Sequence, residues 1–271
     1  MILKNFFLLF FICSGFISRA QSIQYGDNKA AGKYYAIRGI KMYCEIYGKG
    51  QPLVMIHGNG GSIAAFKMNI GYFSKKYKVI VADMRAQGKS IDTADSLSYE
   101  MMADDIAALM DTLKVDSAYV IGWSDGGIDG LLLAMRHPEK VKKLAITGAN
   151  LWPGTSAIVE SSVEGDKKRL AELDSKTFKT PAEKNEYKLI YMMQVQPDIP
   201  LSSLASIHCP VLVMAGDHDL IKPEHTLLIY QNLPKAYLWI VPNSGHPTLM
   251  DQKDMFNNTV NNFFTKPFHV F

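Results

Sequence analysis

The chain has 271 residues, of which 48% are hydrophobic and 20% are charged, with 20 Gly and 12 Pro. These fractions are ordinary for a globular protein, and they exclude a collagen-like or largely disordered chain. The formal net charge of +3 arises from 29 basic and 26 acidic side chains without basic runs, so nothing in it calls for a nucleic-acid partner. The length fits one large α/β domain that carries a small insertion.

The first twenty residues are typical of a secretory signal peptide. Lys4 is positively charged, residues 6–16 are almost continuously apolar, and Ser18 and Ala20 supply small side chains at positions −3 and −1 of a cleavage site. We expect cleavage after Ala20, export to the periplasm or the extracellular space, and no stable membrane insertion of the mature chain. An uncleaved anchor is the alternative, but the apolar run is shorter than the roughly 18–20 residues that span a bilayer. A lipoprotein attached through Cys13 is a weaker alternative, because a bulky residue precedes it.

Short apolar runs and amphipathic stretches alternate along the rest of the chain. Strands are predicted at runs that are rich in Val and Ile, several of them apolar on both faces: residues 41–47, 52–57, 78–82, 118–121, 141–147, 210–215 and 237–241. Helices are predicted between them, where apolar residues recur at helical spacing: residues 99–113, 127–136, 226–232 and 252–264. This alternation predicts an α/β fold with a mostly parallel central sheet and helices on both faces.

Residues 151–206 interrupt the alternation. The segment is charged and amphipathic, with candidate helices at residues 164–173 and 182–195 and no predicted strand. We expect it to form a short helical lid, inserted between two parts of the core at residues 21–150 and 207–271. A lid of this kind would lie at the carboxyl ends of the strands, where open α/β sheets bind ligands.

Two cysteines, Cys44 and Cys209, remain after the predicted signal peptide. A pair of cysteines in an exported protein suggests a disulfide. The predicted topology would, however, place them on well-separated strands of one sheet. We therefore expect both thiols to be free and buried.

The strongest functional signal is the run Gly122-Trp123-Ser124-Asp125-Gly126-Gly127, which follows a predicted strand and precedes a predicted helix. It matches the G-x-S-x-G nucleophile elbow in the strand–turn–helix context that such a motif requires. The sharp turn forces the serine out of the chain path, and the helix N-terminus supplies free N–H groups to an anion formed beside it. We predict that Ser124 is a nucleophile rather than an incidental residue in a Gly-rich turn.

A serine hydroxyl needs a base, and the base needs an acid to orient it. His246 lies in a loop after the last predicted strand, and the run Gly216-Asp217-His218-Asp219 follows the strand before it. We choose Asp219 as the acid because it lies further along the loop, whereas Asp217 is close enough to the strand to serve as a turn or cap residue. The order Ser124, Asp219, His246 is that of the α/β-hydrolases.

The remaining histidines are expected to be structural. One marks a helix end, one precedes a strand, two flank the acid loop as surface or supporting groups, and one is in the tail: His137, His208, His218, His225 and His269. The sequence contains neither H-E-x-x-H nor paired Cys/His spacing, so we expect no catalytic metal and no cofactor.

Two backbone N–H groups are candidates for an oxyanion hole. One belongs to Asp125, directly after the predicted nucleophile. The other belongs to the Gly-rich loop at residues 57–61, where we choose the N–H of Asn59 over that of Gly60. A phosphate-binding loop is the competing interpretation of residues 57–61, but the Lys-Ser/Thr pair of a P-loop is missing.

These motifs resemble the α/β-hydrolase superfamily over residues 39–264. Further similar features are the His57-Gly58 pair and residues 83–90, which look like the family's D-x-R-G-x-G-x-S stretch with Ala86 in place of a Gly. The resemblance implies the roles already argued for Ser124, Asp219 and His246.

Within the superfamily, the elbow together with Gly148-Ala149-Asn150 looks most similar to the valacyclovirase (biphenyl hydrolase-like) serine hydrolases. In that group the Asp after the nucleophile helps to recognise the amine of amino-acid esters, which implies such a role for Asp125. The alternative is that this carboxylate faces solvent or bonds within the elbow. Trp123 and Trp152 are further candidates for substrate contacts.

The sequence therefore predicts an exported serine hydrolase that cleaves small carboxylic esters, amine-bearing esters among them, through an acyl-enzyme. Hydrolysis of an amide, a thioester or a C–C bond by the same three residues is an alternative, because the triad does not fix the substrate. A ligand-binding protein on a hydrolase scaffold is another, although no triad member is missing. The oligomeric state is left open.

Overall fold

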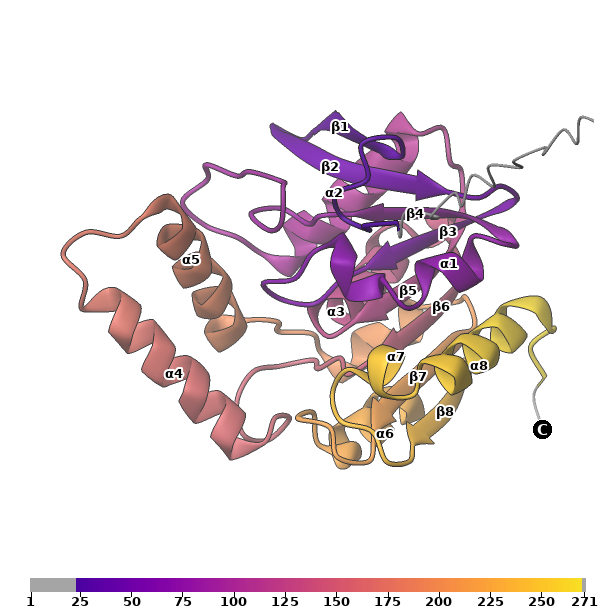
Figure 1. Cartoon of the computed structure of the whole chain (residues 1–271). Helices are drawn as coiled ribbons and strands as arrows, with labels where there is room; N and C mark the ends of the chain where they lie inside the picture. The colour runs from indigo at the N-terminus through magenta and orange to yellow at the C-terminus, as the bar shows by residue number, and fades with distance from the viewer. Residues whose placement is uncertain (1–22, 270–271) are drawn as a thin grey trace, which may run out of the picture.

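The computed structural model describes residues 23–269, and the predicted signal peptide lies outside them. An eight-stranded sheet forms the centre of the fold, in the order β1-β2-β4-β3-β5-β6-β7-β8 (Figure 1). The pairs β1–β2 and β2–β4 are antiparallel, and all other neighbours are parallel. The strands are β1 (Gly32–Ile37), β2 (Ile40–Tyr47), β3 (Gln51–Ile56), β4 (Tyr77–Ala82), β5 (Ala118–Trp123), β6 (Val141–Thr147), β7 (Val211–Gly216) and β8 (Ala236–Val241).

Helices cover both faces of the sheet, as the alternating pattern predicts. Residues of α2, α3 and α6 pack into one apolar cluster, and residues of α1 and α8 into the other. The α-helices are α1 (Ile70–Phe73), α2 (Tyr99–Thr112), α3 (Asp125–Arg136), α4 (Glu160–Asp174), α5 (Pro181–Val195), α6 (Pro223–Gln231), α7 (Thr248–Asp251) and α8 (Lys253–Thr265). Three short 3₁₀ turns are η1 (Ile63–Phe66), η2 (Pro138–Lys140) and η3 (Leu201–Ser206).

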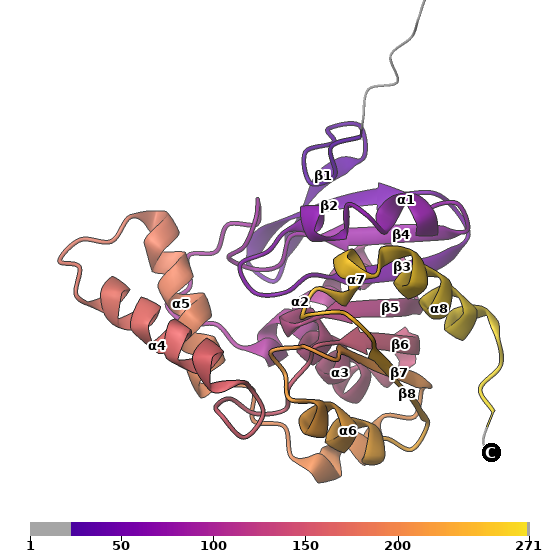
Figure 2. The same ribbon diagram turned by 60° about the horizontal axis from the view of Figure 1, so that its bottom comes forward.

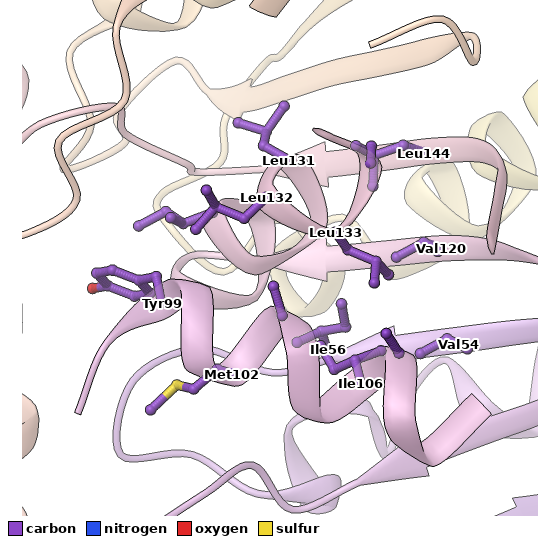
Figure 3. Packing of buried hydrophobic residues seen from close by; sticks show 14 of the residues in the cluster. Val54, Ile56, Tyr99, Met102, Ile106, Val120, Leu131, Leu132, Leu133 and Leu144 are labelled. Atoms are coloured by element: carbon purple, nitrogen blue, oxygen red, sulfur yellow. The ribbon is translucent and has the colours of Figure 1, made fainter. Parts of the chain in front are cut away.

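The larger apolar cluster lies between the central strands and the pair α2–α3. In Figure 3, Val54 and Val120 of the sheet face Ile106 of α2 and Leu133 of α3. These side chains are buried, so they stabilise the fold by roughly 1.5–3 kcal/mol each. This packing holds the carboxyl end of β5 and the start of α3 in place.

All seven predicted strands are present, with bounds within two residues of the expected ones, and one further strand was not predicted. That strand, β1, is an edge strand whose side chains are mostly exposed or half-buried, so the apolar pattern that predicts buried strands is absent. Its turn into β2 is formed by Arg38 and Gly39, whose φ angles of 42° and 88° suit a two-residue hairpin.

Both cysteines are free, as predicted, but only one is buried. Cys44 lies in β2, and four strands separate β2 from β7 in the sheet. Cys209 is half-buried, and the prediction of its burial is wrong because it lies in the connection before β7 rather than within a strand. Within residues 23–269, every helix is too short or too polar to cross a bilayer.

The segment of residues 151–206 enters between β6 and β7 and contains α4, α5 and η3. Figures 1 and 2 show α4 and α5 as a pair that projects from one end of the sheet. Both helices are longer than the predicted ranges. A single β-bridge between Ile158 and Ile221 ties the start of this segment to the loop after β7.

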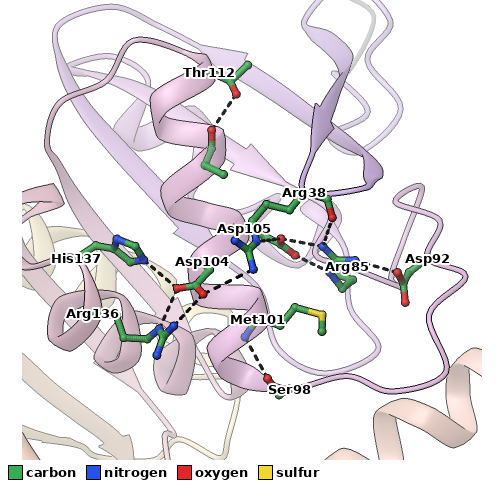
Figure 4. Close-up of polar contacts among 11 residues, drawn as sticks. Arg38, Arg85, Asp92, Ser98, Met101, Asp104, Asp105, Thr112, Arg136 and His137 are labelled. Carbon is green, nitrogen blue, oxygen red and sulfur yellow. Dashed lines mark hydrogen bonds and ion pairs between the residues drawn. The ribbon is translucent and has the colours of Figure 1, made fainter.

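Arg85, the arginine of the D-x-R stretch, is buried and joins two elements of the fold. The Arg85 guanidinium makes two hydrogen bonds, of 2.6 and 2.8 Å, to the carboxylate of Asp105 on α2, and a third of 2.9 Å to Asp92. Figure 4 shows this group beside the more exposed pair of Asp104 with Arg136. The arginine thus fixes the loop after β4 against α2. Ala86 has a φ of 62° in this loop, a backbone conformation that explains why a Gly is usual there.

Candidate active site

Ser124 occupies a sharp turn between the end of β5 and the start of α3. Its φ and ψ of 57° and −123° are strained for a residue with a side chain. Only glycine fits at the two positions beside this turn. A Cβ at Gly126 would lie 2.1 Å from the carbonyl oxygen of Ile56, and one at Gly122 would lie 2.1 Å from the carbonyl oxygen of Gly126. The predicted nucleophile elbow is therefore present in the structure.

The structure brings Ser124, His246 and Asp219 together, although they are far apart in the sequence. Nε2 of His246 lies 2.9 Å from Oγ of Ser124, and its Nδ1 lies 2.7 Å from Oδ1 of Asp219. The Asp219 side chain is completely buried, while that of His246 is 16% exposed. Asp219 also accepts backbone N–H bonds from Ile221 at 3.0 Å and Gly216 at 3.3 Å, which orient its carboxylate.

Two neighbours fix the position of the imidazole. The indole N–H of Trp123 donates to the backbone carbonyl of His246 at 3.1 Å, and the two rings lie 5.7 Å apart. Gly148, at the end of β6, leaves room for the ring, because a Cβ there would lie 2.7 Å from Cε1 of His246. Trp123 therefore supports the histidine loop.

Asp217, the other candidate for the acid, stabilises the loop that precedes His246. It accepts hydrogen bonds of 3.0 Å from the backbone N–H groups of Asn243 and Ser244. These bonds lower the pKa of Asp217 because they stabilise its charged form. Asp217 is thus a turn residue, and Asp219 is the carboxylate that contacts the imidazole.

The other histidines do not reach Ser124. His137, at the C-terminal end of α3, lies 2.9 Å from Asp104 of α2. The side chain of His218 is 81% exposed. Of the two roles predicted for His225, the supporting one fits, because the residue is buried and its Nε2 accepts the backbone N–H of Leu151 at 2.9 Å. Burial lowers the pKa of His225 to about 4, so it is neutral at pH 7. His208 and His269 are exposed.

The Gly-rich loop after β3 passes directly over Ser124. A Cβ at Gly58 would lie 2.9 Å from Cβ of Ser124, so only a glycine allows this approach. The loop is fixed by the buried His57, whose Nε2 accepts the backbone N–H of Met84 at 3.0 Å. Asn59 follows, and its side-chain amide donates to the Asp125 carboxylate at 2.8 Å. The backbone segments chosen for the oxyanion hole therefore lie on either side of Ser124.

The Asp125 side chain turns inward and bonds to protein groups. The residue is only 5% exposed, and burial raises the pKa of Asp125 to about 6 although hydrogen bonds from Asn59 and Tyr99 lower it. One helical turn later, Asp129 is buried, and neither of its carboxylate oxygens has a hydrogen-bond partner among the described residues. Burial raises the pKa of Asp129 well above its ordinary value, because it disfavours the charged form of the carboxyl group.

A cavity of about 170 Å³ opens beside Ser124 and His246. Its wall combines the core and the segment of residues 151–206: Tyr99, Asp125, Asn150, Gly154, Ile158, Ser162, Val163, Asp166, Met193, Gln194, Gln196, Leu220 and Ile221. Trp123 and Trp152 lie outside this lining. The indole of Trp152 donates to Ser156 at 2.9 Å and meets His225 edge-on. Among residues 23–269, the lining contains two carboxylates and no Lys or Arg.

Two residues of the cavity wall, Tyr99 and Asp166, are not among the site residues predicted from the sequence. Tyr99 lies at the start of α2, where its aromatic ring fits the apolar stripe of that helix (Figure 3). Asp166 lies within a charged helix whose orientation the sequence does not fix. The spacing of Ser162 and Asp166, four residues apart on one face of α4, is a signal that could have been used.

Comparison with known proteins places the chain in a family. Residues 51–183 match the family model described as the alpha/beta hydrolase fold. The enol-lactonase of Burkholderia xenovorans LB400 has a similar solved structure, with a TM-score of 0.71, 22% identity, and coverage of 86% of this chain and 100% of the enzyme.

Curated hydrolases are similar to the chain in sequence over most of its length. The putative carbamate hydrolase RutD of Caulobacter sp. (strain K31) is 27% identical over 83% of this chain and 96% of its own length. The 2-hydroxy-6-oxononadienedioate/2-hydroxy-6-oxononatrienedioate hydrolase of Comamonas testosteroni is 28% identical over 80% and 88%. Serine hydrolase BPHL of Homo sapiens is 26% identical over 84% of each chain. The chain is therefore an enzyme of the α/β-hydrolase family, with BPHL among its relatives.

Proposed function

We propose that this enzyme is an exported serine hydrolase that cleaves small carboxylic esters, including esters that carry an amine. The observation that carries the proposal is the contact of Ser124 Oγ with Nε2 of His246 at 2.9 Å, with Asp219 at 2.7 Å on the other side of the ring. This is the hydrogen-bond chain that a serine nucleophile, a general base and an orienting acid require.

The first half of the reaction forms an acyl-enzyme. His246 takes the proton of Ser124 as its oxygen attacks the ester carbonyl carbon, and Asp219 stabilises the imidazolium that results. The proton then passes from Nε2 to the leaving alkoxide, so that the alcohol departs and the acyl group stays on Ser124. General base assistance of this kind accelerates such a step by about 10²–10⁴-fold.

The negative charge that develops on the carbonyl oxygen needs donors that are already in place. Asp125 is the first residue of α3, where backbone N–H groups have no partner within the helix. We assign one donor to this N–H and the second to the N–H of Asn59 in the loop over Ser124. Each donor contributes roughly 3 kcal/mol to the stability of the transition state.

The second half of the reaction releases the acid. His246 removes a proton from a water molecule, whose oxygen attacks the carbonyl carbon of the acyl group on Ser124. The same two N–H groups stabilise the second oxyanion, and the proton returns through Nε2 to the serine oxygen. The products are a carboxylic acid and regenerated enzyme, and the triad needs no cofactor for either step.

The size and charge of the cavity favour small, amine-bearing substrates. Its volume of about 170 Å³ is below the roughly 300–1,000 Å³ that drug-sized ligands occupy. The acidic side chains of its lining are Asp125 and Asp166. The dioates named for the relative from Comamonas testosteroni carry two negative charges, which these carboxylates would repel. This supports esters over anionic C–C hydrolase substrates.

The test is the loss of esterase activity in Ser124→Ala. We expect hydrolysis of p-nitrophenyl acetate and labelling by a fluorophosphonate probe to fall to background, because within residues 23–269 Ser124 carries the hydroxyl that is hydrogen-bonded to His246 and no other hydroxyl is. Ser162→Ala is the matched control, since Ser162 lines the same cavity on α4 and should leave both signals within about threefold. Retained turnover and labelling in Ser124→Ala would refute the proposal.

A further inference from the structure

We propose that the carboxylate of Asp166 on α4 binds a positively charged nitrogen of the substrate, so that the segment of residues 151–206 selects esters with an ammonium group. The inference rests on the proposed esterase function and deepens it. It differs from the role that family resemblance implies for Asp125. Two carboxylates line the cavity, and their surroundings show which of them is available to a ligand.

Asp125 is already engaged by protein groups. Its Oδ2 accepts the amide of Asn59 at 2.8 Å, and the hydroxyl of Tyr99 is a second hydrogen-bond partner. Burial raises the pKa of Asp125 to about 6, so a fraction of its carboxyl groups is neutral near that pH. A cation would have to compete with two existing donors for this group. Asp125 therefore holds the Gly-rich loop and the start of α2 in place around Ser124.

Asp166 has no such partners. It is half-buried in the cavity wall, and within residues 23–269 it makes no hydrogen bond through its side chain and no ion pair. Burial raises the pKa of Asp166 by disfavouring its charged form, an effect that an ammonium group in the cavity would offset. An ammonium group of a ligand would thus give Asp166 the charge-assisted hydrogen bond that no group within residues 23–269 supplies.

The backbone holds Asp166 in a defined place relative to the triad. The N–H of Val159 donates to the carbonyl of Leu220 at 2.8 Å, and the N–H of Lys222 donates to that of Ala157 at 2.8 Å. These bonds join the start of α4 to the loop that carries Asp219. Asp166 is six residues into the helix, roughly 9 Å along its axis, and shares its cavity face with Ser162.

The experiment compares two esters of equal shape that differ in charge. L-alanine methyl ester and methyl 2-methylpropanoate have nearly the same volume, and only the first carries an ammonium group. A second pair, methyl 6-aminohexanoate and methyl heptanoate, places the charge further from the carbonyl. We expect the wild-type enzyme to prefer the charged member of at least one pair in kcat/KM, and Asp166→Asn to reduce that preference by about tenfold.

Glu164→Gln is the matched control, because Glu164 is an exposed acid on the same helix that lies outside the cavity lining. Its preference should equal that of the wild type. No preference in the wild-type enzyme, or a preference lost in Asp125→Asn and kept in Asp166→Asn, would overturn the inference.

Binding separates this inference from the proposed function. In the Ser124→Ala background, calorimetry with the charged and neutral esters reports affinity without turnover. We expect Asp166→Asn to weaken binding of the charged ester about tenfold and to leave the charged and neutral esters equal in affinity. If the enzyme hydrolyses none of the four esters but this binding difference holds, the reaction assignment fails while the role of Asp166 stands. If the affinities do not differ, the role of Asp166 fails.

Discussion

The two aspartates that follow β7 show how much single positions matter at this site. They are two residues apart, yet Asp219 contacts the imidazole whereas Asp217 accepts backbone N–H groups of the loop before His246. Sequence reasoning separated them by their distance from the strand end, because a residue next to a strand is placed to cap a turn. The same reasoning left the side chain of Asp125 open, since only the folded chain brings Asn59 and Tyr99 to it.

Asp219→Asn should lower kcat for p-nitrophenyl acetate by about 10²–10⁴-fold, because a neutral amide neither fixes the imidazole tautomer nor stabilises its charged form. Asp217→Asn is the matched control and should cost less than about tenfold, since an amide oxygen still accepts a backbone N–H. Steady-state kinetics with circular dichroism of both variants checks this. Equal losses in the two variants would contradict the assignment of the acid.

His225 gives the enzyme a pH-dependent stability. Its pKa is about 4 in the folded protein and has the ordinary value of 6.5 when exposed, so protons bind preferentially to the unfolded chain between these values. Stability from this residue is complete above pH 6.5 and is lost as pH falls toward 4. Between pH 7 and pH 4.5 the loss amounts to about 2 kcal/mol.

Urea unfolding of the wild type and His225→Gln at the two pH values tests this expectation. Glutamine keeps an acceptor for the N–H of Leu151 but does not titrate. The free energy of unfolding of the variant should therefore fall by about 2 kcal/mol less than that of the wild type. An equal fall in both proteins would show that His225 does not titrate in this range.

Among the elements, the parallel strands and the long helices follow from the sequence, whereas β1 and the short helices do not. Buried parallel strands must be apolar on both faces, and this pattern is visible in the chain. The edge strand β1 has exposed side chains at Lys33, Tyr34 and Ala36, which leaves no apolar pattern to detect. The Asp166 side of the cavity was unpredictable for a related reason, because the orientation of α4 depends on contacts with α5 and with the loop after β7.

Helix α2 carries neighbouring aspartates whose substitution should have unequal effects. Asp105 is fully buried against Arg85, so Asp105→Ala leaves a buried guanidinium without its main partner and should reduce the free energy of unfolding by about 3–5 kcal/mol. Asp104 is half-buried and pairs with the more exposed Arg136, and Asp104→Ala should cost about 1 kcal/mol. Chemical denaturation of both variants measures this difference. Similar values would show that the buried pair contributes no more than the exposed one.

For the whole molecule, export remains a prediction from the first twenty residues. Expression of the full chain in a bacterial host should yield a protein that begins at Gln21 in the periplasmic or extracellular fraction, because small residues precede the predicted cleavage site. Ala20→Phe should prevent this processing, and a chain that starts at residue 21 should remain inside the cell. Intact Met1 on a protein that stays in the cytosol would contradict export.

The connection between β6 and β7 has a consequence for how new specificities arise. These strands are direct neighbours, with Leu144 beside Val211 and Thr147 beside Met214. The chain thus departs from one strand and rejoins the adjacent one, so residues 151–206 lie between two paired strands without separating them in the sheet. Grafting a foreign helical hairpin in place of α4 and α5, with residues 151–159 kept, would change which molecules are admitted while the loop that carries Asp219 keeps its bonds to Ala157 and Val159.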